Sequence, residues 1–251
     1  MITIKSKSEF ELMREAGRLV ADTLERLRSA VRPGVSTADL DLLAYENITK
    51  HDGVPSFKGY GRPPFPASIC ASVNDEVVHG IPSKRRVLHE GDIVSLDCGA
   101  IVRGWHGDAA ITVPVGKPTP EVQRLLAITE ESLRKGIEAV APGKRIGDIS
   151  SAIQRFVEAE GFSVVREYVG HGIGREMHED PQVPNWGTPG RGMLLKRGMA
   201  LALEPMVNAG GAEVRVLDDH WTVATKDGQY SAHFEHTVAL TDDGARVFTI
   251  L

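Results

Sequence analysis

The sequence predicts an α+β fold in which two similar halves, roughly residues 1–118 and 119–251, form a single domain with an antiparallel sheet and covering helices. Three features recur in the same order in both halves: a helix–turn–helix entry, an apolar strand that ends in an acid, and a strand that begins with an acid. Proline-glycine turns alone would mean little, since they are common in loops. Three matching segments in the same order favour an internal duplication, with the two halves related by a pseudo-twofold axis.

The first half opens with two predicted helices. Apolar residues at helical spacing predict a helix from about Glu9 to Ser29, and Ser8 with Glu11 reads as its capping box. After a Pro-Gly turn, a second helix is expected over 37–50.

The second half repeats this pattern. A helix over 120–140, with Thr119 as its cap and proline at its first position, is predicted to open it. A further helix over about 148–160 ends at Gly161, a residue type favoured after a helix C-terminus.

The repeat has a nearly constant offset. The turn Pro33-Gly34 recurs as Pro142-Gly143, 109 positions later (142 − 33). The apolar strand that ends at Asp97 corresponds to the one that ends at Glu204, 107 positions later (204 − 97). A loop-length change of about two residues explains the difference and costs little.

Four acids occupy matching places in these strands: Asp97 and Glu204 at strand ends, Asp108 and Glu235 at strand starts. Period-two alternation puts each acid on a face with mostly small side chains, while the opposite faces are apolar. Taken singly, such an acid more often faces solvent or pairs with a cation. Four that converge across a pseudo-twofold axis need positive charge, and two bridged divalent ions would neutralise them.

Histidines narrow the choice of metal. His171 and His178 lie in a glycine-rich stretch, and the His-Gly-Ile triplet at His171 also occurs at His79. An imidazole among carboxylates favours manganese, iron, cobalt or zinc over calcium or magnesium. Of the other histidines, three are interpreted as surface residues and three stay unassigned: His51, His89 and His220, then His106, His233 and His236.

Composition excludes several classes of function. The net charge of −5 gives no reason to expect nucleic-acid binding. Two cysteines without CxxC spacing, Cys70 and Cys98, fit reduced thiols in the cytosol. Charges interrupt the N-terminal apolar residues, and no segment reaches membrane length, so we expect a soluble cytoplasmic protein without signal peptide or membrane span.

Five motifs together resemble the pita-bread metallopeptidases, in particular the short bacterial type I methionine aminopeptidases. The resemblance covers nearly the whole chain and rests on these segments: Cys70–Asn74 with His79–Pro82, Trp105–Asp108, Gly170–Gly174, Glu204–Asn208 and Glu235–Thr237. It implies a pita-bread fold and a hydrolase that removes the initiator methionine from nascent proteins and peptides with a small second residue.

The resemblance also implies roles for individual residues. The metal ligands would be five side chains, Asp97, Asp108, His171, Glu204 and Glu235, with Asp108 and Glu235 bridging two divalent ions and a hydroxide between them as nucleophile. Glu204 would also relay a proton. His178 would donate to the carbonyl oxygen, and His79 would contact the scissile amide nitrogen.

The positions that match the family's methionine pocket are Phe65, Cys70, Met177 and Trp221, with Tyr60 nearby. Phe65 and Met177 replace the tyrosine and phenylalanine commoner in relatives, and ordinary core packing is the alternative reading of Tyr60 and Met177. The implied partner is the N-terminal methionine of nascent chains, with the ribosome as a candidate place of encounter. A monomer is implied, without nucleic acid or membrane.

Two alternatives remain open. Other pita-bread peptidases cleave next to proline, but they usually carry an additional N-terminal domain, and type II methionine aminopeptidases carry a helical insertion for which the second half leaves little room. A protein that kept the fold only as a binding module would tend to lose ligands. All five matching residues are present here.

Overall fold

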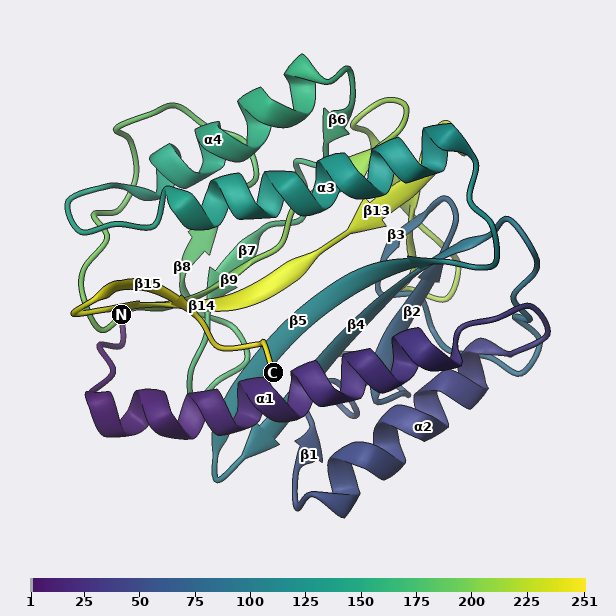
Figure 1. Ribbon diagram of the computed structural model, residues 1–251, viewed down its shortest axis with the longest axis horizontal. Helices are drawn as coiled ribbons and strands as arrows, with labels where there is room; N and C mark the ends of the chain where they lie inside the picture. Colours follow the sequence, from purple (N-terminus) through teal and green to yellow (C-terminus); the bar gives the residue numbers. More distant parts are fainter. Residues whose placement is uncertain (1) are drawn as a thin grey trace.

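The computed structural model describes residues 2–251 and arranges the helices as two pairs. In Figure 1 the first pair lies below the strands and the second pair above them. The pairs are α1 (Lys7–Ala30) with α2 (Thr37–Lys50), and α3 (Pro120–Glu138) with α4 (Ile146–Ala159). None of these helices combines the length and apolar character of a membrane span.

The strands form one large and two small sheets, and every pairing between them is antiparallel. The large sheet has the order β1-β4-β5-β14-β9-β7-β8, with β2 also on β4 and β15 also on β14. Its strands are β1 (Val54–Pro55), β2 (Ile69–Val73), β4 (Ile93–Val102), β5 (Trp105–Pro114), β7 (Gly170–Gly172), β8 (Glu179–Val183), β9 (Ala200–Leu203), β14 (Glu235–Thr241) and β15 (Gly244–Val247). The small sheets contain β6 (Ser163–Val164), β10 (Met206–Asn208) and β13 (Ser231–His233), and β3 (Glu76–Val78), β11 (Val214–Val216) and β12 (Val223–Thr225). The predicted α+β class is confirmed.

The predicted start of the first helix was wrong. The capping box is formed by Ser6 and Glu9, not by Ser8 and Glu11: the Ser6 hydroxyl accepts from the Glu9 N–H, and the Glu9 carboxylate accepts from the Ser6 N–H. Glu11 instead pairs with Arg14 on the helix surface. Because residues 5–9 are all polar, the apolar pattern could not locate this terminus.

The second helix has the predicted bounds, and the other two differ slightly. α3 has the predicted Thr119 cap but ends at Glu138, two residues earlier than expected. α4 begins at Ile146 because the Asp148 carboxylate accepts from the Arg145 N–H, which places the cap at 145.

The turn that precedes the second helix of each pair, α2 or α4, has the same backbone hydrogen bonds in both places. The N–H of Leu88 donates to the Val35 carbonyl at 2.8 Å, and the N–H of Leu195 donates to the Lys144 carbonyl at 2.8 Å. An isolated antiparallel bridge follows in each half: Ser36 with Val87, and Arg145 with Leu194. The offsets, 109 (145 − 36) and 107 (194 − 87), are those of the sequence repeat.

Each helix pair covers its own apolar core on one side of the large sheet. Val94 and Leu96 of β4 belong to the core under α1 and α2. Leu201, Leu203 and Val238 belong to the core under α3 and α4. Since side chains alternate along a strand, the residues between them face the opposite side of the sheet.

Two threonine hydroxyls join the halves where β5 meets β14. The ladder between these strands has only two register pairs. On one side of it, the Thr237 hydroxyl accepts from the Asp108 N–H at 3.0 Å and donates to the Asp108 carbonyl at 2.8 Å. On the other side, the Thr112 hydroxyl bonds the N–H and the carbonyl of His233, both at 2.8 Å. These hydroxyls supply hydrogen bonds where the backbone ladder ends.

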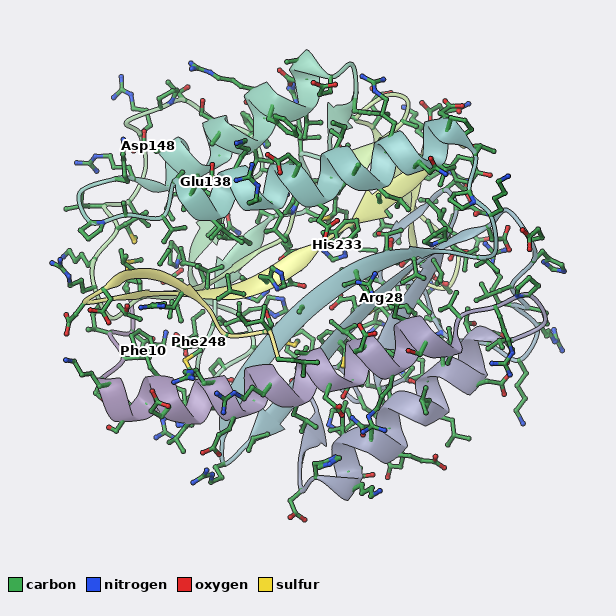
Figure 2. All side chains as sticks on the ribbon, in the orientation of Figure 1. Phe10, Arg28, Glu138, Asp148, His233 and Phe248 are labelled. Carbon is green, nitrogen blue, oxygen red and sulfur yellow. The ribbon has the colours of Figure 1, made fainter. Side chains whose placement is uncertain are left out.

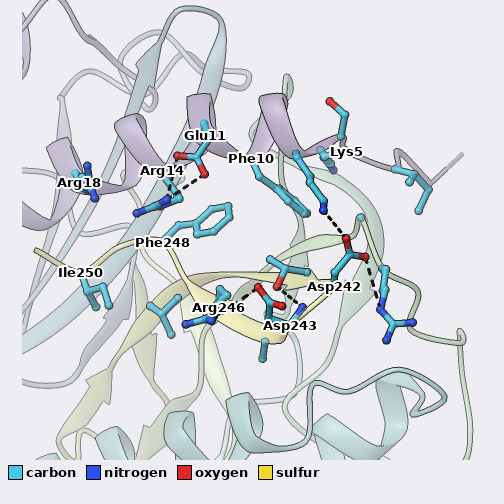
Figure 3. Close-up of a pocket in the computed structure, with 18 of the residues that line it drawn as sticks. Lys5, Phe10, Glu11, Arg14, Arg18, Asp242, Asp243, Arg246, Phe248 and Ile250 are labelled. Carbon is cyan, nitrogen blue, oxygen red and sulfur yellow. Dashed lines mark hydrogen bonds and ion pairs between the residues drawn. The ribbon is translucent and has the colours of Figure 1, made fainter.

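The C-terminal segment around Phe248 packs against α1. Figure 2 shows Phe10 and Phe248 together, and their rings make an edge contact with centroids 5.5 Å apart. The α1 backbone comes so close that a Cβ on Gly17 would lie 2.4 Å from the Phe248 carbonyl oxygen, and one on Gly107 would lie 2.7 Å from the Gly17 nitrogen. A cavity of about 910 Å³ lies at this junction, lined partly by Phe10 and Phe248 (Figure 3).

We expect Thr237→Val to lower the free energy of unfolding by about 1–3 kcal/mol, because it leaves the buried N–H of Asp108 without its acceptor. Urea unfolding monitored by circular dichroism measures the change. Thr188→Val, at an exposed loop position, is the matched control and should stay within about 0.5 kcal/mol of wild type. Equal stability of the two variants would contradict the structural role of the Thr237 hydroxyl.

Candidate metal centre and adjoining pocket

Strand register places three acids on the same face of the large sheet. Asp97 of β4 pairs with Ala110 of β5, and Ala110 pairs with Glu235 of β14. Paired residues on antiparallel strands point to the same side, so Asp97 and Glu235 lie on one face. Asp108 lies two residues before Ala110 and therefore shares that face.

The remaining two candidate ligands reach this face from the second half. Thr237, two residues after Glu235, pairs with Ala202 of β9, which pairs with His171 of β7. Glu204 follows two residues after Ala202, just beyond the end of β9. The acidic face, defined as the face that carries Asp97, Asp108, His171, Glu204 and Glu235, thus collects all five predicted ligands.

The geometry of the acidic face fits metal ions. One donor atom each from Asp108, His171 and Glu235 lies within 4.8 Å of the other two. Buried oxygens of Asp97, Asp108 and Glu235 have no hydrogen-bond partner among the described residues. Buried carboxylate oxygens without donors are costly, and coordination to a cation would compensate them. Carboxylates with one imidazole suit first-row transition metals.

Burial and mutual repulsion shift the acids toward their protonated forms. Burial, followed by the negative charges of Asp108 and Glu204, raises the pKa of Asp97 well above its usual range. Burial raises the pKa of Asp108 to about 7. The pKa values of Glu204 and Glu235 rise well above normal for the same reasons, burial first and neighbouring carboxylates second. Without cations, the protein cannot hold all four charges at neutral pH without strong repulsion.

His171 is oriented as a ligand by its own strand. Its Nδ1 lies 2.9 Å from the carbonyl oxygen of Gly172, which can only accept, so Nδ1 carries the proton. Nε2 is then free to coordinate, and it lies 3.6 Å from Glu204 Oε1. Burial, followed by the nearby His178, lowers the pKa of His171 to about 3, which keeps the ring neutral.

A cavity of about 130 Å³ joins the acidic face to an apolar pocket. Phe65, Cys70 and Met177 are buried there, and Trp221 meets the Phe65 ring edge-on at 5.2 Å. All twelve side chains that the sequence analysis proposed for the site line this cavity: Asp97, Asp108, His171, Glu204, Glu235, His79, His178, Tyr60, Phe65, Cys70, Met177 and Trp221.

Two histidines border the pocket from different elements. His79 follows β3 with a left-handed backbone (φ 60°), and its ring meets Trp221 edge-on at 6.0 Å. Burial lowers the pKa of His79 to about 4. His178 lies beside the candidate ligand His171, with 4.2 Å between the two ring centroids, and its Nδ1 is 2.7 Å from the Tyr60 hydroxyl at the pocket rim.

Two residues of this region were not predicted from the sequence. Phe57 lines the cavity beside Phe65, but it precedes an irregular loop where no periodicity marks its direction. His233, left unassigned, is buried with Nε2 3.7 Å from Glu204 Oε2; its position two residues before Glu235 was the available signal.

The remaining histidines lie outside the cavity. His106 bonds Ser56, and His236 bonds Thr249. The three predicted surface histidines, His51, His89 and His220, are exposed.

Comparison with known proteins gives a consistent picture. The sequence profile of metallopeptidase family M24 matches residues 11–242. The chain is 56% identical over 250 residues to the methionine aminopeptidase of Clostridium acetobutylicum, covering 100% of this chain and 99% of that protein. The solved structure of methionine aminopeptidase from Thermotoga maritima superposes with a TM-score of 0.98 at 49% identity, with 100% of both chains covered.

A more distant likeness supports the fold alone. Prolidase from Pyrococcus furiosus matches with a TM-score of 0.79 at 21% identity, covering 99% of this chain but 65% of that one. The pita-bread fold expected from the sequence is therefore confirmed.

We expect the metal-free protein to lose stability as the pH rises above about 6.5. The buried carboxyls have raised pKa values in the folded state, so folding retains protons that the unfolded chain, with values near 4, has released. That stabilisation is lost as the pH rises through the folded pKa values, at up to about 1.4 kcal/mol per pH unit per proton. The lowered pKa of His171 acts oppositely, but its effect is complete above about pH 6.5.

Urea unfolding after chelator treatment, between about pH 6.5 and 9, measures this slope. Glu235→Gln cannot ionise and should flatten it. A wild-type stability that is constant or rises over this range would contradict the assigned carboxyl shifts.

Proposed function

Because this chain belongs to metallopeptidase family M24, we propose that it is a metal-dependent aminopeptidase that removes the first methionine from peptides and newly made proteins. The observation that carries the proposal is that one cavity brings five side chains of the kinds that bind metal ions next to an apolar pocket. The whole-length similarity to methionine aminopeptidases supports the same substrate.

Each ligand side chain has a proposed place. Asp97 would hold one ion, His171 and Glu204 the other, and Asp108 and Glu235 would bridge both. The buried oxygens of Asp97, Asp108 and Glu235 that lack hydrogen-bond partners support this assignment. When bound, two divalent ions would supply Lewis-acid chemistry and lower the pKa of water that acts as the nucleophile.

The chain's own side chains would handle protons and orientation. Glu204 would accept a proton from water and pass it toward the leaving amine. His178 would donate to the carbonyl oxygen as negative charge develops there. His79, neutral and held against Trp221, would contact the scissile amide nitrogen.

The apolar pocket would select methionine. Phe65, Cys70 and Met177 offer a buried, polarisable wall for a flexible thioether. Trp221 closes one side against Phe65. A small second residue would be required, because the second side chain would face the crowded wall of this cleft.

We further propose that the protein acts in the cytoplasm as a monomer, on chains that leave the ribosome. Nascent chains carry the initiator methionine, which is why the ribosome is the proposed place of encounter.

Metal-loaded protein should release methionine from Met-Ala-Ser, whereas Asp108→Ala should be inactive, with at least about a thousandfold loss of kcat, because both ions would lose a bridging ligand. Chromatography of the products and elemental analysis of bound metal test this. A folded, metal-loaded wild type that leaves the peptide intact would favour a binding module. Unchanged kcat in Asp108→Ala would refute the bridging role.

His79→Ala should keep its metal but lower kcat by about a hundredfold, since it would remove a hydrogen bond to the reacting amide. Metal content by elemental analysis, together with steady-state kinetics, separates the two effects. His89→Ala, at an exposed position, is the matched control and should behave as wild type. Loss of metal from His79→Ala would show that this histidine is itself a ligand.

A further inference from the structure

A short loop presents Tyr60 at the pocket rim. Glycines with positive φ stand on both sides of it, Gly59 (84°) and Gly61 (79°). The Gly59 N–H donates to the Phe65 carbonyl at 2.8 Å, and the Phe65 N–H donates to the Tyr60 carbonyl at 2.7 Å, which closes the loop. The Gly61 backbone packs against the Trp221 ring, and a Cβ on Gly61 would lie 2.5 Å from the indole. The loop therefore fixes where the phenol points.

The phenol reaches a specific atom of His178. Tyr60 Oη lies 2.7 Å from His178 Nδ1, and the two rings are 5.2 Å apart and tilted by 41°. Burial raises the pKa of Tyr60, so its hydroxyl keeps its proton. With that proton donated to Nδ1, a neutral imidazole must carry its own N–H on Nε2.

The reverse arrangement uses the contact less well. If Nδ1–H donated to the phenol, the Tyr60 hydroxyl would only accept, and its own proton would have to point away from the ring. Donation from the phenol to Nδ1 instead leaves the Nε2–H on the side of the cavity that His178 lines.

We propose that Tyr60 is a positioning residue: its hydroxyl donates to His178 Nδ1 and holds the ring as the Nε2–H tautomer, with that N–H directed toward the substrate carbonyl oxygen. The hydrogen bond itself is independent of the substrate, while the catalytic consequence rests on the proposed function. Tyr60 is therefore more than a pocket wall, which is the role suggested by its place in the sequence.

Ring ¹⁵N NMR of histidine-labelled, zinc-loaded protein at about pH 8 tests the tautomer directly, with His178→Ala to assign the signal. Wild type should show a protonated Nε2 and an unprotonated Nδ1 in His178. Tyr60→Phe should move both signals toward the values of mixed tautomers. A protonated Nδ1 in wild type, or identical spectra in the two proteins, would overturn the proposal whether or not the protein cleaves methionine.

Kinetics on Met-Ala-Ser tests the consequence. Tyr60→Phe should lower kcat about tenfold, the order expected for a group that orients a catalytic histidine, with KM within about twofold. Tyr45→Phe removes a hydroxyl from an exposed ring on α2 and should match wild type.

A double variant separates positioning from an independent role. Tyr60→Phe with His178→Ala should be no slower than His178→Ala alone, since groups that act through one another are not additive. A further tenfold loss, or full activity in Tyr60→Phe, would refute the positioning role. A wild type that leaves methionine in place but shows the Nε2–H signal would refute the proposed function while keeping the hydrogen bond.

Discussion

The structure is organised around carboxylates that cannot neutralise one another. Asp97, Asp108, Glu204 and Glu235 line one cavity, and buried oxygens of three of them lack a partner in residues 2–251. No lysine or arginine lines this cavity in the described structure. Such a cluster is tolerable only when protonated or bound to cations, so the fold keeps a destabilised site ready for metal.

The sheet makes this placement precise because register and face are linked. A slip of one residue in β4 or β5 would turn Asp97 or Asp108 into the apolar core and move a core residue into the site. Ten register pairs between β4 and β5 oppose such a slip. Between the halves the ladder is short, and the hydroxyls of Thr112 and Thr237 hold the strands in register instead.

Local signals predicted much of this molecule. Alternation along the strands correctly placed Asp97 and Glu235 on a face with small residues, because strand periodicity is local. The role of these side chains as ligands, and the division into halves near residue 118, stay predictions. Contacts between distant segments could not be read from the sequence: the bond from Tyr60 to His178 spans 118 positions, and the direction of Phe57 depends on an irregular loop.

The packing of α1 has a consequence for biosynthesis. Gly17 contacts both Phe248, near the C-terminal end, and Gly107, the neighbour of Asp108. α1 therefore completes its packing only once the segment that contains Phe248 has been synthesised. Glu235 also lies far along the chain. A nascent chain that stops short of Glu235 would lack one of the proposed ligands, so it should be inert.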